Sequence, residues 1–370
     1  MKTYPKIIAM YLPQYHSIPE NDEFWGKGFT DWDTVRRAVP LFPGHQQPKI
    51  PYNSNYYDLS EKSNIEWQAK LARENGIYGF GIYHYWFNND KNLLTKPAEI
   101  ILRNKDIDIN YFFAWDNSNW KRSWSNVAGN DWAPIMERSQ VKGESAILIP
   151  YILGGKKDWE IHYNSLRPYF HDNRYIKKDN KPVYIIFNYS EQIAEMCSYW
   201  QELARKDGFN GVFFIFRYRE SYNIPESENV FRYEPLFSGW SGVPSLFARM
   251  KNRANRIMGV NIGPTKYRYD EIWDKILKNA RTACEEVIFP GAFVSYDDTP
   301  RRGRRGIVVG GATPEKFKYY LSNLLEIVAK QNKEFIFLTA WNEWGEGAYL
   351  EPDSKYGMDY LKAIKDIVTI

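Results

Sequence analysis

Short apolar runs, most of them followed by a longer amphipathic stretch, recur along the chain. The runs are typical of buried strands, and the stretches have the spacing of helices that bury one face, as Ile65, Ala69 and Ala72 do. The strands predicted in this way are 7–12, 78–86, 109–115, 147–153, 182–188, 212–216, 231–237, 289–296 and 335–340. The predicted helices are 60–75, 93–104, 157–170, 190–206, 243–258, 270–286, 314–330 and 356–370.

Strands and helices alternate about eight times, which predicts an α/β fold whose parallel sheet closes into a (β/α)8 TIM barrel. No composition shift or repeat divides the chain, so we expect residues 1–370 to form a single domain with long strand-to-helix loops. The segment from Pro13 to about Leu59 has little helical period and is rich in Pro, Gly, Asn and aromatic residues. Long irregular segments in compact domains are usually functional, so this one is predicted to form much of one rim of the site.

Polar and aromatic residues end several of the predicted strands. In a TIM barrel the chemistry lies at the carboxyl ends of the strands, so these residues are predicted to meet at one end of the barrel. They are Tyr11, His84, Trp115, Asp116, Tyr296, Asp297, Trp341 and Glu343.

The most informative stretch is Trp341–Gly347, which follows the last predicted strand and contains Glu343 and Glu346. Two carboxylates walled by aromatic residues suit glycosidic bond chemistry, because an apolar wall raises a carboxyl pKa and lets one group act as an acid. The alternative is a surface loop with two solvated acids. Trp341 and Trp344 argue against that alternative, since two indole rings favour an enclosed site.

Composition narrows the function classes. Aromatic residues make up 17% of the chain, with 14 Trp and 28 Tyr, which favours carbohydrate handling but also suits a large core. A net charge of +4 gives no reason to expect nucleic acid, and the two cysteines show no metal-binding spacing. We expect no metal and no cofactor. The start lacks the apolar core of a secretory signal, and no run is long enough to span a membrane, so the expected location is cytoplasmic.

Several motifs resemble the WbsX-like proteins of bacterial polysaccharide loci. They are Tyr11–His16, Pro19–Thr30, Tyr83–Phe87, Thr299–Arg302 and Trp341–Gly347, which together span nearly the whole chain. That family is often labelled glycosyltransferase, yet it is related to the endo-α-mannosidase and endo-α-1,2-mannanase family, glycoside hydrolase family ninety-nine, a family of (β/α)8 barrels.

The resemblance implies a mechanism for the two glutamates. Glu343 is similar to the residue that takes the proton from the substrate's 2-hydroxyl group, and Glu346 to the residue that protonates the leaving oxygen. Retention of configuration would then pass through a 1,2-anhydro sugar, without the carboxylate nucleophile of the usual retaining scheme.

The substrate-binding residues are predicted from the strand ends, the motifs and their neighbours. They are Tyr11, His84, Trp86, Trp115, Asp116, Asn117, Tyr296, Asp297, Arg301, Trp341, Asn342 and Trp344. The family more often has Ala-Asn after the Trp at 115, and Trp-Asp-Asn at 296–298, so Asp116 and Asp298 leave the sugar specificity open.

Each of these predictions has a structural alternative. His84 could simply pack among aromatic neighbours, and Asp116 and Asn117 could cap a helix. Arg301 lies in an arginine cluster that could bind a phosphate or a sugar carboxylate, or form a solvated loop. The Asp106-Ile107-Asp108 stretch fits the metal-binding pattern of some glycosyltransferases, but it precedes a strand and is better explained as a solvated turn.

These observations favour a retaining glycoside hydrolase, endo-acting on an α-mannan-like or related polysaccharide. The alternative is a glycosyltransferase or transglycosylase of capsule or O-antigen biosynthesis, with a sugar acceptor in place of water. A carbohydrate-binding protein without activity is a third class, against which the intact Glu343 and Glu346 pair argues.

Overall fold

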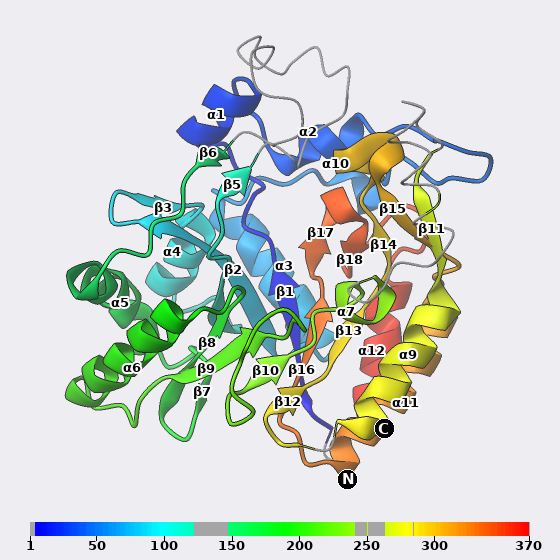
Figure 1. Ribbon diagram of the computed structural model, residues 1–370. Helices are drawn as coiled ribbons and strands as arrows, with labels where there is room; N and C mark the ends of the chain where they lie inside the picture. The colour runs from blue at the N-terminus through cyan, green and yellow to red at the C-terminus, as the bar shows by residue number, and fades with distance from the viewer. Residues whose placement is uncertain (1–3, 122–146, 241–249, 251–262, 284, 370) are drawn as a thin grey trace.

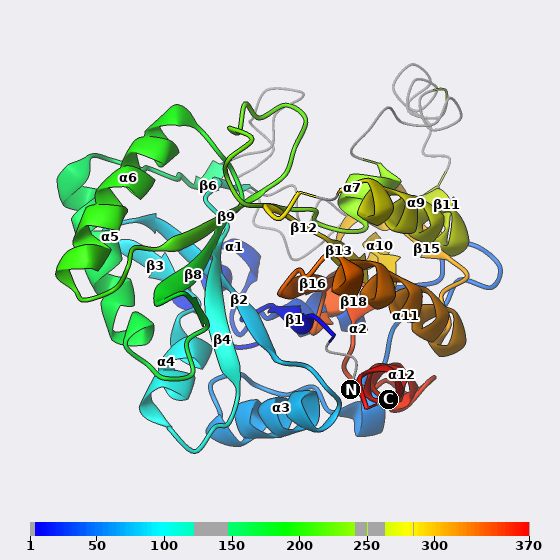
Figure 2. The same ribbon diagram turned by 90° about the horizontal axis from the view of Figure 1, so that it is seen from below.

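Parallel strands form a nearly closed barrel surrounded by helices in the computed structural model, which describes residues 4–121, 147–240, 250, 263–283 and 285–369 (Figures 1 and 2). The hydrogen-bonded order of the barrel strands is β12-β10-β9-β8-β4-β2-β1-β16-β13. The TIM-barrel fold predicted from the alternation of strands and helices is therefore confirmed.

The elements fall into three groups. The barrel strands are β1 (Lys6–Tyr11), β2 (Gly79–Asn88), β4 (Asn110–Trp115), β8 (Lys181–Ile186), β9 (Phe213–Arg217), β10 (Val230–Phe231), β12 (Ile288–Phe289), β13 (Gly291–Phe293) and β16 (Phe335–Thr339). The outer helices are α3 (Lys62–Glu74), α4 (Lys96–Arg103), α5 (Lys156–Phe170), α6 (Glu191–Lys206), α9 (Tyr269–Thr282), α11 (Pro314–Lys330) and α12 (Asp359–Val368). The smaller elements are α1 (Pro19–Trp25), α2 (Asp31–Arg36), α7 (Leu236–Gly239), α10 (Thr299–Arg302), β3 (Lys91–Leu93), β5 (Trp120–Lys121), β6 (Ile147–Ile149), β7 (Lys177–Lys178), β11 (Thr265–Arg268), β14 (Tyr296–Asp297), β15 (Ile307–Gly310), β17 (Asn342–Glu343), β18 (Ala348–Tyr349) and the 3₁₀ turns η1 (Tyr52–Ser54), η4 (Gly303–Arg305) and η5 (Trp344–Glu346).

One stretch of chain joins the two ends of the sheet. Strands β12 and β13 flank Pro290; β12 pairs with β10, and β13 pairs with β16. Proline has no N–H to donate to a strand ladder, which interrupts the pairing at this point. The Pro290 carbonyl still accepts a hydrogen bond from the Phe337 N–H at 3.2 Å, so the barrel stays connected across the break.

Aromatic rings from separate strands fill the middle of the barrel. The Phe337 ring of β16 lies 5.3 Å from that of Phe231 on β10, 5.9 Å from Phe289 on β12 and 6.1 Å from Phe112 on β4, measured between centroids. All four side chains are buried. Because β16 and β4 are not neighbours in the sheet, their contact crosses the interior, which is packed rather than hollow.

The described residues 218–229, between β9 and β10, form a loop, and the sequence predicts no helix there. The elements differ from the prediction in two places. The strand predicted at 231–237 ends at Phe231, before Pro235, and the chain then enters the short helix α7. Strand β6 pairs with β5 and lies outside the barrel. Apart from residue 250, the helix predicted at 243–258 lies outside the described residues.

The long segment after β1 is more ordered than its sequence suggested. It contains α1, α2 and η1, and α1 and α2 lie at the end of the barrel opposite the two termini (Figure 1). Helix α2 begins with a capping box, in which the Asp33 side chain accepts a hydrogen bond from the Thr30 N–H at 3.0 Å. Along the described part of the chain, no helix has the length and apolar character needed to cross a bilayer.

Candidate active site

The loop after β16 folds back on itself and presents two glutamates. Strand β17 pairs antiparallel with β18, and the turn η5 connects them. Gly347 closes the turn with a φ of +56°, and a Cβ there would lie 3.0 Å from Asp297, so glycine suits both the backbone and the close approach. This hairpin holds Glu343 in a strand and Glu346 in the adjoining turn.

The hairpin is fastened to the loop after β1. Asn342 Oδ1 accepts a hydrogen bond from the Leu12 N–H at 2.7 Å, and Asn342 Nδ2 donates to the Leu12 carbonyl at 3.0 Å. The Tyr15 hydroxyl donates to the Asn342 carbonyl at 2.6 Å. These buried hydrogen bonds restrict the backbone on which Glu343 lies, which is what an active-site carboxylate requires.

One arginine lies against both glutamates. Arg301, in α10, donates from Nη1 to Glu346 Oε1 at 2.8 Å and from Nη2 to Glu343 Oε2 at 3.2 Å. Asp31, in α2, accepts from Arg301 Nε at 3.2 Å and from Nη2 at 3.0 Å. The guanidinium therefore bridges three carboxylates, two from the hairpin and one from α2.

The two glutamates differ in their exposure to solvent. The Glu343 side chain is 6% exposed, whereas that of Glu346 is 22% exposed. Burial raises the pKa of Glu343; the positive charge of Arg301 opposes that shift, and the negative charges of Glu346 and Asp31 add to it. Glu343 thus holds a proton more strongly than an ordinary glutamate.

The glutamates open onto a cavity of about 430 Å³ at the carboxyl end of the strands. Tyrosines form part of its wall, and the Tyr83 and Tyr233 hydroxyls lie 2.7 Å apart. The residues lining it are Tyr83, Tyr85, Asp116, Ser118, Phe187, Asn188, Arg217, Arg219, Tyr233, Pro235, Leu236, Trp240, Tyr296, Arg301, Arg302, Glu343 and Glu346. The mixture of carboxylates, guanidinium groups and aromatic faces suits a polar ligand with flat apolar faces, such as a sugar.

Five of the residues predicted from sequence meet in this cavity, namely Glu343, Glu346, Arg301, Tyr296 and Asp116. Burial raises the pKa of Asp116, although the Ser118 hydroxyl donates to its Oδ1 at 2.7 Å and favours the charged form. The remaining predicted residues do not line the cavity.

His84, Trp86 and Trp115 belong to a buried aromatic cluster around His162. The Nε2 atoms of His84 and His162 lie 2.9 Å apart, and the Trp86 ring stacks on His162 at 4.3 Å. The Trp115 indole donates to the Trp86 carbonyl at 2.9 Å. Burial lowers the pKa of His84 to about 3, so the imidazole is uncharged near neutral pH and is shielded from solvent. The structure favours the packing alternative for His84.

Tyr11, Trp341 and Trp344 lie in or next to the hairpin that carries Glu343 and Glu346. The Tyr11 hydroxyl donates to Gln68 Oε1 at 2.7 Å, and Trp341 is fully buried. The Trp344 indole donates to Glu351 Oε2 at 2.7 Å. Their rings are buried in the protein interior and do not line the cavity that contains Glu343.

Asn117 and Asp297 tie loops together. Asn117 Nδ2 donates to the Asn188 carbonyl at 2.7 Å and joins the loops after β4 and β8, so it does not cap a helix. Asp297 Oδ2 lies 2.8 Å from His45 Nε2 and accepts from Gln47 Nε2 at 2.7 Å. Asp297 and its neighbours face a different cavity, described below.

Sequence reasoning did not single out several residues of the cavity. Tyr83 and Tyr85 alternate along β2, and Arg217 ends β9, so strand-end logic could have found them. Asp31 has no comparable local signal, although the segment containing it was predicted to form a rim. Within the ranges that the structure describes, no group of three or more His, Cys, Asp or Glu side chains is arranged to hold a metal ion.

Comparison with known proteins identifies the family. The sequence profile described as Glycosyltransferase WbsX matches residues 7–364. The chain belongs to the WbsX family. Two uncharacterized proteins called WxcX, from Xanthomonas campestris pv. campestris strains B100 and ATCC 33913, are each 27% identical to it over 373 residues. The match covers 98% of this chain and 49% of each relative, so this WbsX chain spans about half the length of the curated relatives it matches.

Solved structures of glycoside hydrolases share the barrel. The GH99 endo-alpha-mannosidase from Bacteroides thetaiotaomicron superposes with a TM-score of 0.57 at 12% identity, over 98% of this chain and 96% of that one. A structure named glycoside hydrolase-like protein gives a TM-score of 0.57 at 14% identity, over 98% of this chain and 94% of that one. At such low identities these superpositions show a shared fold, and the WbsX chain therefore has a barrel like that of these proteins.

Proposed function

We propose that this WbsX chain is a retaining glycoside hydrolase, endo-acting on an α-mannan-like or related polysaccharide. The observation that supports it is the pair Glu343 and Glu346, bridged by Arg301 at the wall of a cavity of about 430 Å³. That volume lies within the usual range for small-ligand pockets, roughly 300–1,000 Å³.

The proposed reaction has two steps, with a 1,2-anhydro sugar between them. In the first, Glu343 takes the 2-hydroxyl proton, the sugar O2 bonds to C1, and the bond from C1 to the leaving oxygen breaks as Glu346 protonates that oxygen. In the second, Glu346 takes a proton from water, the water oxygen bonds to C1, and the C1–O2 bond opens as Glu343 returns its proton to O2. Two inversions at C1 give net retention. The route requires a 2-hydroxyl trans to the leaving group, as in α-mannose.

The environments of the two carboxylates fit these roles. A buried Glu343 with a raised pKa is a stronger base than an ordinary glutamate, which suits abstraction from a weakly acidic hydroxyl. Glu346 is the more exposed of the two and can meet the leaving group and then water. Arg301 balances the negative charge of the pair while each glutamate exchanges its proton with the substrate or with water.

Glycosyl transfer is the second candidate. Arg217, Arg219 and Arg302 line the same cavity together with Arg301, and guanidinium groups bind phosphate bidentately. A donor sugar with a phosphate leaving group would suit such a wall, and the family description also names a glycosyltransferase.

The decisive experiment is a panel of bacterial and fungal polysaccharides incubated with the wild-type protein and the Glu343→Gln and Glu346→Gln variants. We expect released oligosaccharides from the wild type and none from either variant. NMR of the first product should show retained anomeric configuration, and an otherwise cleaved substrate should resist attack once its reactive 2-hydroxyl is replaced by hydrogen.

Glu195→Gln, on the exposed face of α6, is the matched control and should behave as wild type. Cleavage of the 2-deoxy substrate at the normal rate would refute the anhydro-sugar route. If no polysaccharide is cleaved while a nucleotide sugar is consumed in a parallel assay, the result would refute hydrolysis and support glycosyl transfer.

A further inference from the structure

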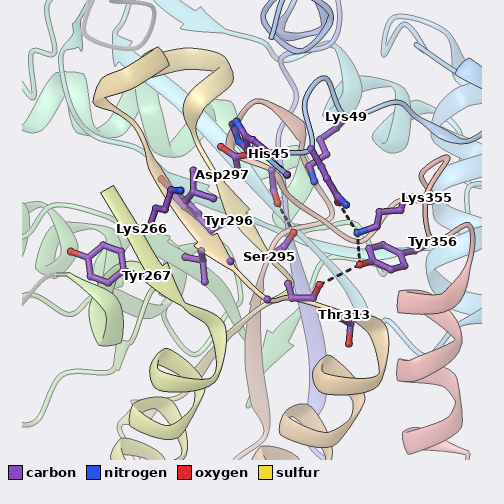
Figure 3. Close-up of a pocket in the computed structure, with 18 of the residues that line it drawn as sticks. His45, Lys49, Lys266, Tyr267, Ser295, Tyr296, Asp297, Thr313, Lys355 and Tyr356 are labelled. Carbon is purple, nitrogen blue, oxygen red and sulfur yellow. Dashed lines mark hydrogen bonds and ion pairs between the residues drawn. The ribbon is translucent and has the colours of Figure 1, made fainter. Parts of the chain in front are cut away.

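A second cavity, of about 600 Å³, lies beside the catalytic one (Figure 3). Tyr296 lines both cavities, but neither Glu343 nor Glu346 lines this one. Its walls come from the 42–49 loop, strand β11, the turn before α11 and the segment before α12. The volume lies within the usual range for a small-molecule site, roughly 300–1,000 Å³.

Three lysines line the cavity from three separate segments. Lys49 and Lys355 approach it from one side and Lys266 from the other (Figure 3). The Lys266 ammonium lies 3.3 Å from the centroid of the Phe42 ring, and Lys355 donates to the Gln46 side chain at 2.6 Å. Among the residues that the structure describes, none of the three lysines forms an ion pair with a carboxylate.

The two aspartates of the cavity already have other partners. Asp297 lies against His45 and Gln47, as described above, and the Thr299 hydroxyl donates to it at 2.6 Å. Asp353 accepts from the Tyr349 hydroxyl at 2.8 Å and from two backbone N–H groups. Both carboxylates are therefore hydrogen-bonded to groups other than the three lysines.

Lys49 is the lysine most affected by this excess of positive charge. It makes no hydrogen bond or ion pair with any described residue, and burial lowers its pKa despite the more distant Asp297 and Asp353. Lys49 is half-buried, and partial loss of hydration is costly for an ammonium group that no carboxylate contacts directly. An anionic group in the cavity would remove that cost.

Other features of the cavity favour a sugar that carries the anion. Tyr356 supplies an aromatic ring at its wall, against which a pyranose face can pack. Thr313, where the turn enters α11, already accepts the Lys316 N–H at 3.3 Å, so its hydroxyl hydrogen remains available for an anionic oxygen. The positive end of the α11 dipole lies at the same edge.

We propose that this lysine-lined cavity is a second saccharide-binding site that takes a sugar bearing a phosphate or a carboxylate group. Three ammonium groups without a hydrogen-bonded carboxylate supply the charge, and the Tyr356 ring and the Thr313 hydroxyl supply contacts for the sugar. The site does not depend on which reaction Glu343 and Glu346 perform.

Isothermal titration calorimetry with glucose 1-phosphate, glucuronate and neutral glucose tests the site and separates the two anion types. We expect at least one of the two anions to bind, at least tenfold tighter than glucose, and added NaCl to weaken that binding. Lys266→Met and Lys355→Met should each weaken it by roughly tenfold or more, the scale of one charge-assisted hydrogen bond. Both side chains are exposed at the rim, so the variants should fold.

Three controls locate the ligand. Lys275→Met, on the exposed face of α9, and Glu343→Gln should bind as the wild type does, and Lys266→Arg should retain binding because it keeps the charge. Arg219→Met tests the catalytic cavity, whose arginines could also attract an anion. The proposal is overturned if neither anion binds, if glucose binds equally well, or if Arg219→Met abolishes binding while the lysine variants do not.

Discussion

Glu343 lies in the hairpin and Glu351 just after it, eight residues further along the chain, and as whole residues they are almost equally buried, at 5% and 3% exposure. Glu343 faces a cavity, a second carboxylate and the Arg301 guanidinium. Glu351 faces only neutral donors, since it accepts from the Tyr57 hydroxyl at 2.8 Å, from Gln68 at 2.7 Å and from the Trp344 indole at 2.7 Å.

Burial raises the pKa of both glutamates, that of Glu351 to about 7. A raised pKa therefore does not distinguish a reactive carboxylate from a structural one. Glu343 differs in two ways: it lines a cavity, and a second carboxylate, Glu346, accepts a hydrogen bond from the same guanidinium group. Glu351 instead holds aromatic side chains in and next to the hairpin by hydrogen bonds. The two glutamates should therefore respond differently to the same substitution.

The largest expected effect is on activity. Glu343→Gln should lower the rate on a cleaved polysaccharide by roughly 10²–10⁴-fold, the usual contribution of a general acid or base, and leave the fold intact. Glu351→Gln should stay within tenfold of the wild-type rate, because its carboxylate does not reach the cavity. Initial rates of oligosaccharide release from a polysaccharide cleaved by the wild type give the comparison. Equal losses of activity in the two variants would contradict the different roles of the two glutamates.

Removing the arginine should have the largest effect on stability. Arg301→Met leaves Asp31 and Glu343 buried without their counter-ion, and breaking a buried ion pair costs roughly 3–5 kcal/mol. Urea unfolding measures the loss. Arg103→Met, whose side chain is 71% exposed and pairs with Glu99, should cost about 1 kcal/mol or less. A loss for Arg301→Met no greater than that of the control would contradict the buried network.

The pH dependence of stability should reveal Glu351. Its pKa is about 7 in the folded protein and near 4.5 when unfolded, so between these values the folded state binds more protons. Stability should therefore fall as the pH rises from 4.5 to 7, by about 3 kcal/mol from this residue. Other carboxyls with raised pKa values add to the slope, so the quantity to measure is the difference between wild type and Glu351→Gln in urea unfolding at several pH values. The difference should be absent for Glu195→Gln.

The smallest effect concerns Asp31, which acts on Glu343 through Arg301. Its negative charge helps to raise the pKa of Glu343, so Asp31→Asn should lower that pKa. If Glu343 is the base, the acid limb of the kcat/KM profile moves to lower pH. Asp33→Asn, in the capping box of the same helix, should leave the limb in place. A purely structural role for Asp31 would reduce the rate at every pH without moving the limb.

Much of the fold followed from local pattern. Apolar runs and amphipathic stretches predicted the barrel, and the position of Glu343 and Glu346 after the last strand predicted where they would lie. The position of β6 outside the barrel was not predicted, because a short strand has the same local pattern inside or outside a barrel.

The site was predicted less completely. Strand-end position selected Asp116 and Tyr296 correctly as cavity residues, but it also selected His84 and Trp115, which pack among other rings. Successive side chains at a strand end point to opposite faces, and the sequence does not say which face meets the cavity.

The sequence by itself determined the alternation of elements, the end of the barrel at which the chemistry gathers and the two glutamates on one loop, since each depends on the local order of residue types. Only the tertiary structure decided their neighbours. Asp31 lies 270 positions from Arg301 in the chain, and the two meet because closure of the barrel brings the loops after different strands to one end. The charge around a carboxylate is a property of that assembly, and no local pattern encodes it.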